Sequence, residues 1–129
     1  MAEVNQELPP KAAEFARGSI ERIAENIEVV HRFVEDMDFK VFHSNPVTRS
    51  AVEMCIIRIG EAAARLPESV SLQWRDVPAQ QMIDLGKELS QRYWDVDYEA
   101  VWAAVTVEYR DLLEQFNQAL SDTSALEKD

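Results

Sequence analysis

The sequence is poor in the residues that cross-link or interrupt a chain. Its 129 residues include one cysteine, Cys55, together with three glycines and five prolines. A single cysteine excludes an intrachain disulfide and a zinc site built from cysteines. Few glycines and prolines leave room for few turns. A chain of this length is therefore expected to form a small number of long helices.

Positive charge is also scarce. Lysine and arginine together number 13 against 24 aspartates and glutamates, which gives a net charge of −11. Nucleic-acid binders usually carry a basic surface, so strong non-specific binding of RNA or DNA is disfavoured, and only weak RNA binding through a local basic patch stays open. A polybasic membrane anchor is disfavoured for the same reason.

Long apolar runs are absent. No run approaches the roughly 18 residues of a membrane-spanning helix, and the opening stretch MAEVNQELPPKAAEF lacks the apolar core of a signal peptide. With 47% hydrophobic and 29% charged residues, the composition is typical of a globular domain. We therefore expect one soluble, cytoplasmic domain with no membrane contact, no metal and no cofactor.

Apolar spacing predicts helices along the chain. In the first helix, apolar residues recur every three or four positions, as in an amphipathic helix. No strand-like alternation occurs, so the predicted fold class is all-α, an up-and-down four-helix bundle. The bundle is expected over residues 11–120, between a flexible arm at 1–10 and a polar tail at 121–129. The apolar stripe of the first helix consists of Ile20, Ile23, Ile27, Val30, Val34 and Met37.

The second helix has a clear predicted start, with Asn45 as its cap and Pro46 at its first position. Residues 52–59 are apolar almost all round, which predicts burial on more than one side and contact with a partner subunit. Gly60 and the alanines at 62–64 are small enough for another helix to approach closely. Just before this helix, Phe39 and Phe42 are expected to anchor a loop.

A third helix is expected over residues 78–94, after a connector at 67–78, and Asp97 is expected to cap a fourth. Gly86 lies inside the third helix, where glycine costs about 1 kcal/mol relative to alanine. If it is merely tolerated there, Gly86→Ala should be neutral or stabilising. The buried stripes are predicted to be Met82, Leu85, Leu89 and Tyr93 in the third helix, and Val101, Trp102, Val105, Tyr109, Leu112, Phe116 and Leu120 in the fourth.

Two features of the first two helices have simple interpretations. Glu28 and His31 form a Glu-x-x-His pair, half of the motif of carboxylate di-iron bundles. The second half is missing, since Lys40 stands three positions before the only other histidine, His43, so an exposed polar pair is favoured. Cys55 has no adjacent histidine and lies on the most apolar helix, which favours a small buried hydrophobe over a nucleophile.

Two polar faces allow more than one interpretation. Arg58, Glu61 and Arg65 share one face of the second helix, either as an exposed ion-pair ladder or as the lining of a groove at a subunit interface. The third helix carries a polar face that is either solvated or part of a site. It contains no histidine, so the commonest general base at neutral pH is missing. This second face consists of Asp84, Lys87, Glu88, Gln91 and Arg92.

Several blocks of the sequence, in order and in spacing, resemble the HepT-like family of the HEPN superfamily. These are VEMCIIRIGEAAARLP at 52–67, WRDVP at 74–78 and YWDVDYEAVW at 93–102, and the segments VEDMDFKVF and TRSAV fit as well. The resemblance extends from about residue 17 to about residue 118. It implies a helical bundle that dimerises, and a ribonuclease toxin paired with an MntA-type nucleotidyltransferase antitoxin.

The resemblance also implies a catalytic signature: an arginine, four to six residues, a histidine, and a tyrosine two positions beyond it. In the family, the arginine and histidine meet their copies across the dimer cleft and act on RNA, and the tyrosine receives AMP from the antitoxin. Here Gly86 stands at the arginine position and Gln91 at the histidine position, whereas Tyr93 matches the tyrosine. Neither His31 nor His43 has an arginine at the required distance upstream.

The leading hypothesis is thus a HepT-like homodimer that has lost ordinary ribonuclease activity and works as a binding or regulatory module. Its expected partner is a nucleotidyltransferase antitoxin or a related HEPN chain. One alternative is an enzyme with a rebuilt polar site that cleaves RNA or binds a nucleotide, and another is a purely structural dimer. The candidate groove residues are Arg58, Glu61, Arg65, Asp84, Lys87, Glu88 and Arg92.

Overall fold

The structure, a computed structural model, describes residues 10–68 and 78–127. Its elements, in chain order, are α1 (Pro10–Val34), α2 (Phe39–Ser44), α3 (Pro46–Ala64), α5 (Ala79–Gln91), α6 (Tyr98–Ala103), the π-helical segment η1 (Ala104–Glu108) and α7 (Tyr109–Glu127). Regular structure in these two ranges is entirely helical. The predicted all-α class is therefore confirmed. The predicted arm, except Pro10, and most of the predicted connector lie outside the described residues.

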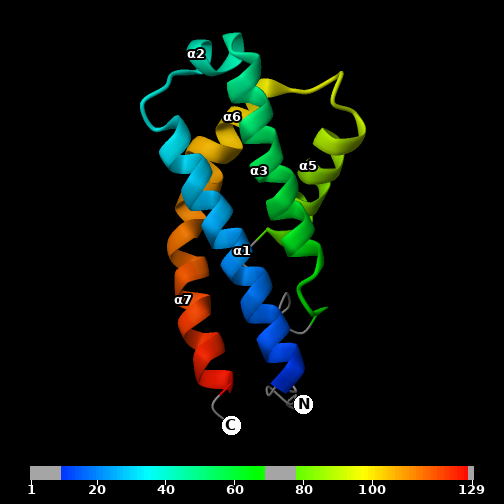
Figure 1. The fold of residues 1–129 in the computed structure, drawn as a ribbon, viewed down its shortest axis with the longest axis vertical. Coiled ribbons are helices and arrows are strands. Elements are labelled where there is room, and N and C mark those ends of the chain that lie inside the picture. The colour runs from blue at the N-terminus through cyan, green and yellow to red at the C-terminus, as the bar shows by residue number, and fades with distance from the viewer. Residues whose placement is uncertain (1–9, 69–77, 128–129) are drawn as a thin grey trace.

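The helices form an up-and-down bundle (Figure 1). α1 packs against α7 on one side and α3 on the other, and α3 also packs against α5. The short helix α2 lies at one end of the bundle. The N-terminal end of α1 and the C-terminal end of α7 lie together at the opposite end. α3 therefore packs between α1 and α5, in a central position that it shares with α1.

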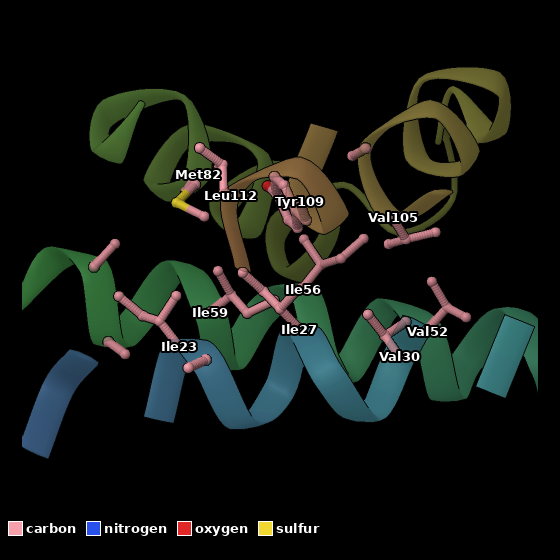
Figure 2. Close-up of a cluster of buried hydrophobic side chains, with 14 of the residues drawn as sticks. Ile23, Ile27, Val30, Val52, Ile56, Ile59, Met82, Val105, Tyr109 and Leu112 are labelled. Carbon is pink, nitrogen blue, oxygen red and sulfur yellow. The ribbon is translucent and has the colours of Figure 1, made fainter. Parts of the chain in front are cut away.

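The core is built from the predicted stripes. Ile23, Ile27 and Val30 of α1 face Val52, Ile56 and Ile59 of α3, and residues of α5 and of the last helices cover them (Figure 2). Full burial of one such side chain stabilises the fold by about 1.5–3 kcal/mol. The α1 stripe is confirmed from Ile20 to Val34, and Met37 packs against the core only in part.

The segment expected to be a loop with aromatic anchors is instead the helix α2. The Asp38 carboxylate starts it by accepting a hydrogen bond of 2.8 Å from the Val41 amide. Phe42 is fully buried, with its ring centre 5.0 Å from that of Trp102. Phe39 is half-buried beside them, so both phenylalanines are anchors, but of a helix.

Asn45 joins two helices. Its side-chain oxygen accepts hydrogen bonds from the Val47 and Thr48 amides at 3.0 and 3.1 Å, and Pro46 is the first residue of α3. Its own N–H donates to the Phe42 carbonyl and closes α2. The predicted cap of α3 is confirmed, and no other residue separates α2 from α3.

The third helix is shorter than predicted, and Tyr93 is not part of its buried stripe. α5 ends at Gln91, because Arg92 leaves helical geometry with φ −133° and ψ 47°. The Arg92 carbonyl accepts a hydrogen bond from Asp95, so the chain turns. Tyr93 lies in this turn with 69% of its surface exposed, whereas Met82 and Leu89 are buried as predicted.

The fourth predicted helix is divided into three parts. Asp97 caps α6 by accepting a hydrogen bond of 3.2 Å from the Ala100 amide, as predicted. The π-helical turn η1 then interrupts the α-helical pattern, and the Thr106 hydroxyl donates to the Trp102 carbonyl there. α7 continues past Ser121 to Glu127. The predicted stripe is buried at Val101, Val105, Tyr109, Leu112 and Phe116, and Trp102 is half-buried.

Candidate functional site

Two of the three glycines face each other where α3 crosses α5. A β-carbon placed on Gly60 would lie 2.8 Å from the Met82 carbonyl oxygen and 3.3 Å from the Cα of Gly86. A β-carbon on Gly86 would lie 3.3 Å from the Cα of Gly60. No glycine in the described ranges has a positive φ. These two glycines therefore allow the backbones of α3 and α5 to approach closely at the crossing, with the tighter contact at Gly60.

A groove runs beside this crossing, between α3 and α5. It has a volume of about 260 Å³. Both positions that correspond to the catalytic pair of the resembling family lie in its lining: Gly86, which is buried, and Gln91, which is exposed at the last residue of α5. The complete lining is Ile57, Gly60, Glu61, Ala64, Ile83, Gly86, Lys87, Ser90 and Gln91.

Only part of the predicted polar set lies in this α3–α5 groove. Glu61 and Lys87 line it, whereas Asp84, Glu88 and Arg92 do not. The Asp84 carboxylate accepts a hydrogen bond of 2.9 Å from Gln80, and the Arg92 guanidinium pairs with Asp95 at 3.1 Å. The Glu88 side chain is exposed. The proposed rebuilt site is thus not assembled as one cluster.

Tyr93 lies beside the groove rather than in its lining. Its ring packs edge-on against Trp94, with 5.4 Å between ring centres. Both rings are about 70% exposed, at 69% and 71%. The phenol is accordingly accessible from solvent in the turn between α5 and α6.

The face formed by Arg58, Glu61 and Arg65 does not form an ion-pair ladder. Within the described ranges, no N–O distance of 4 Å or less joins these side chains. Instead, all three line a second groove of about 220 Å³ between α1 and α3, and Glu61 lines both grooves. This second groove lies between two helices of one chain, so the predicted groove at a subunit interface stays a prediction. The lining also includes Ser19, Arg22, Asn26 and Ala62.

The remaining chemical candidates stay minor. Burial raises the pKa of the Cys55 thiol, and the nearby Arg58 charge opposes that rise only in part. A raised pKa leaves less thiolate, which disfavours a nucleophilic role. Glu28 is exposed and His31 half-buried. Over residues 10–68 and 78–127, no group of three or more potential ligand side chains gathers to hold a metal.

Sequence reasoning missed a polar and aromatic cluster at the α2 end of the bundle. The Tyr98 hydroxyl donates to a Glu53 carboxylate oxygen at 2.7 Å, and the Arg49 guanidinium carbon lies 5.2 Å from the Tyr98 ring centre. Arg49 also donates to the His43 carbonyl. Burial, followed by the Glu53 contact, raises the pKa of Tyr98. These contacts tie α2, α3 and α6 together, and residues 45 positions apart carry no local signal of such a contact.

Comparison with known proteins places the chain in a family. The profile described as "Ribonuclease HepT-like" matches residues 23–119. The chain belongs to the HepT-like ribonuclease family. A relative named "Probable ribonuclease HepT", from Thermococcus cleftensis, is 27% identical over 99 residues, 77% of this chain and 90% of the relative. A second, named "Putative RNase MJ0125", from Methanocaldococcus jannaschii, is 28% identical over 90 residues, 70% of this chain and 78% of the relative.

The family match spans most of the described bundle. It starts within α1 and ends within α7, so the α3–α5 groove lies wholly inside it. The resemblance read from the sequence is confirmed as HepT-like, and the chain stands in the HEPN-type ribonuclease lineage. No match was found among solved structures. In the described ranges, no helix is long and apolar enough to cross a membrane.

Proposed function

We propose that this HepT-like protein lacks ordinary ribonuclease activity and acts as a dimeric binding or regulatory module. One observation supports the proposal: the α3–α5 groove is lined by glycine and glutamine at the two positions where the family has its catalytic arginine and histidine. Gly86 has no side chain and lies against the α3 backbone, and Gln91 is the exposed residue at the other position. These observations support a groove that corresponds to the family site but lacks its arginine and histidine.

The chemistry of RNA cleavage explains why these two replacements matter. Attack by a 2′-hydroxyl requires a group that accepts its proton and positive charge that stabilises the phosphate. A glutamine amide does not take up a proton near neutral pH, and glycine supplies no cation. Lys87 and Glu61, the charged residues of the groove, have opposite signs. The negative charge of the Glu61 carboxylate would repel the phosphate groups of an RNA strand in this groove.

RNA cleavage by the purified protein tests this proposal. We expect no turnover in the absence of metal, for the wild type and for Gln91→Ala alike. Gln81→Ala is the matched control, since Gln81 is exposed on α5 outside the groove lining. Metal-independent cleavage that is abolished by Gln91→Ala or Arg92→Ala, but kept by Gln81→Ala, would overturn the proposal.

The proposed dimer would bring two copies together at the α3–α5 face. Ile57 and Ile83 line the groove there as partly exposed apolar residues, and Met54 on α3 is 47% exposed. Sedimentation analysis should show a dimer that Ile57→Glu dissociates. Val29→Glu, at an exposed apolar position on α1, is the control and should leave the dimer intact. A monomeric wild type at micromolar concentration would refute this part.

The proposed partner is a nucleotidyltransferase antitoxin that attaches AMP to Tyr93. The accessibility of the phenol supports this, since 69% of Tyr93 is exposed. After co-expression with a nucleotidyltransferase from a neighbouring reading frame, mass spectrometry should find AMP on Tyr93 and none in Tyr93→Phe. Tyr98 serves as the internal control, because its hydroxyl donates to Glu53. AMP on both tyrosines would indicate non-specific modification.

The rival proposal, an RNase with a rebuilt site, rests on the shared groove position of Glu61 and Lys87. It also needs Glu88 and Arg92, which are outside that lining. Any RNA cleavage that persists unchanged in Glu88→Gln and Arg92→Gln variants would rule out this rival.

A further inference from the structure

The α1–α3 groove is a separate candidate binding site with an unusual charge. Three arginines line it, Arg22, Arg58 and Arg65, together with a single acidic residue, Glu61. The whole chain has the opposite balance, with 24 acidic and 13 basic residues. This local excess of positive charge is what an anionic ligand would need on an otherwise acidic protein.

The three arginines have no ion-pair partner in the part of the chain that the structure describes. Among the described residues, none of them lies within 4 Å of a carboxylate oxygen. Arg58 lies on α3 and Arg65 is the residue that caps the end of α3; they are seven positions apart, which places them on the same side, about two turns apart. Arg22 comes from α1, and all three side chains are exposed. Their charges therefore surround one hollow from two helices.

Small residues keep the groove open. Its floor includes Ser19 and Ala62, which are 1% and 4% exposed. Gly18 leaves room for the guanidinium of Arg22, because a β-carbon there would lie 3.2 Å from its Nη1 atom. The Asn26 amide nitrogen donates to the Arg22 carbonyl at 2.8 Å, which leaves its side-chain oxygen as an acceptor.

We propose that the α1–α3 groove binds the phosphate group of a small phosphate-bearing ligand. The planar guanidinium forks of arginine match phosphate oxygens and bind them through charge-assisted hydrogen bonds. A groove volume of about 220 Å³ accommodates a phosphate group and part of the molecule to which that phosphate is attached. This site is distinct from the α3–α5 groove of the proposed function, and Lys87 belongs only to the latter.

The surrounding charge favours a small ligand over a nucleic acid strand. The exposed residues near Arg22 on α1 include Glu25 and Glu28, and also Glu21, whose carboxylate pairs with Arg17 at 3.4 Å. A polyanion that extended beyond the groove would pass these carboxylates and meet like charge. A single phosphate group placed between the arginines avoids that repulsion.

Calorimetric titration of the full-length protein tests the ligand class. Inorganic phosphate and AMP should each saturate one site per chain, adenosine should not bind, and added salt should weaken the affinity. A 12-nucleotide RNA should bind no more tightly than AMP. Absence of saturable phosphate binding would overturn the proposal, and tighter RNA binding at the same groove would assign the site to nucleic acid instead.

Charge-removing variants test the location. Arg58→Gln and Arg65→Gln should each weaken phosphate binding about three- to tenfold, the range expected for a charge-assisted contact at a partly exposed site. Arg110→Gln removes the same charge from an exposed position on α7 and should change the affinity less than twofold, about the size of a weak, screened effect. Equal losses in all three variants would mean non-specific attraction, and thermal melts confirm that each variant folds.

Lys87→Gln separates this site from the proposed function. It should leave phosphate binding unchanged, because Lys87 lines only the α3–α5 groove. Loss of phosphate binding in Lys87→Gln, with binding kept in Arg58→Gln, would move the ligand to that groove and refute the present inference. RNA cleavage is a separate measurement, so either proposal can fail alone.

Discussion

Replacing Gly60 by alanine would place a methyl group 2.8 Å from the Met82 carbonyl oxygen, at the crossing of α3 and α5. That oxygen belongs to the α5 backbone, so the contact is relieved only if the helices move apart. Gly86→Ala creates a milder contact, at 3.3 Å from the Cα of Gly60. Gly18→Ala meets only the flexible end of the Arg22 side chain, at 3.2 Å. The same glycine-to-alanine substitution is therefore expected to change the stability differently at Gly60, Gly86 and Gly18.

The magnitudes follow from two opposing effects. Alanine is favoured over glycine in a helix interior by about 1 kcal/mol. Overpacking a well-packed region costs about 1–3 kcal/mol. With the cost near its upper end, Gly60→Ala should lower the free energy of unfolding by about 2 kcal/mol. For Gly86→Ala the two effects nearly cancel, to within about 1 kcal/mol. Gly18→Ala should raise stability by up to about 1 kcal/mol.

Urea unfolding followed by far-UV circular dichroism measures these differences. The double variant of Gly60 and Gly86 should lose less than the sum of its single variants, because both substitutions separate the same two helices. If Gly60→Ala were as stable as Gly18→Ala, the close approach of α3 and α5 would be refuted. The rank order of the three variants is the decisive result.

Three further predictions concern pH, capping and the family site. Burial raises the pKa of Tyr109 above the usual value of about 10, so the folded state keeps that proton longer than the unfolded state. Stability is therefore full below about pH 10 and falls as the pH rises above it. Melting curves should show this fall, Tyr109→Phe should reduce it, and Phe116→Leu, which removes no phenol, should keep it. Asn45→Ala should cost about 1 kcal/mol in urea unfolding, and no loss would contradict its capping role. Gly86→Arg combined with Gln91→His should bring RNA cleavage to a folded variant, and a folded but inactive variant would show that the pair alone is insufficient.

The sequence was most informative where the signal is local. The α1 stripe and the caps Asn45 and Asp97 were predictable, because helix period and capping chemistry involve residues close together in the chain. The end of α5 was not, because it depends on the Arg92 backbone and on the turn that Asp95 closes. The π-helical turn of η1 likewise had no sequence signature.

For the α3–α5 groove, the sequence indicated two of the lining positions but not the complete set of lining residues. The resemblance led to Gly86 and Gln91, and both lie in the α3–α5 groove. Helical phase could have gone further, since positions 83, 86, 87, 90 and 91 share one side of α5. That phase selects Lys87 over Glu88. The shared position of Glu61 depends on how α1 and α5 rotate about α3, which no local spacing records.

The pairing of α1 with α7 has a consequence for biosynthesis. Among the described elements, the stripe of α1 is synthesised first, and α7, the helix that covers one side of it, is synthesised last. A nascent chain therefore exposes part of that stripe until α7 has left the ribosome, and the bundle closes only after translation has passed Phe116. Contacts between such distant segments slow folding. The emerging chain thus offers a binding surface for a chaperone, or for another nascent copy, that the finished protein no longer has.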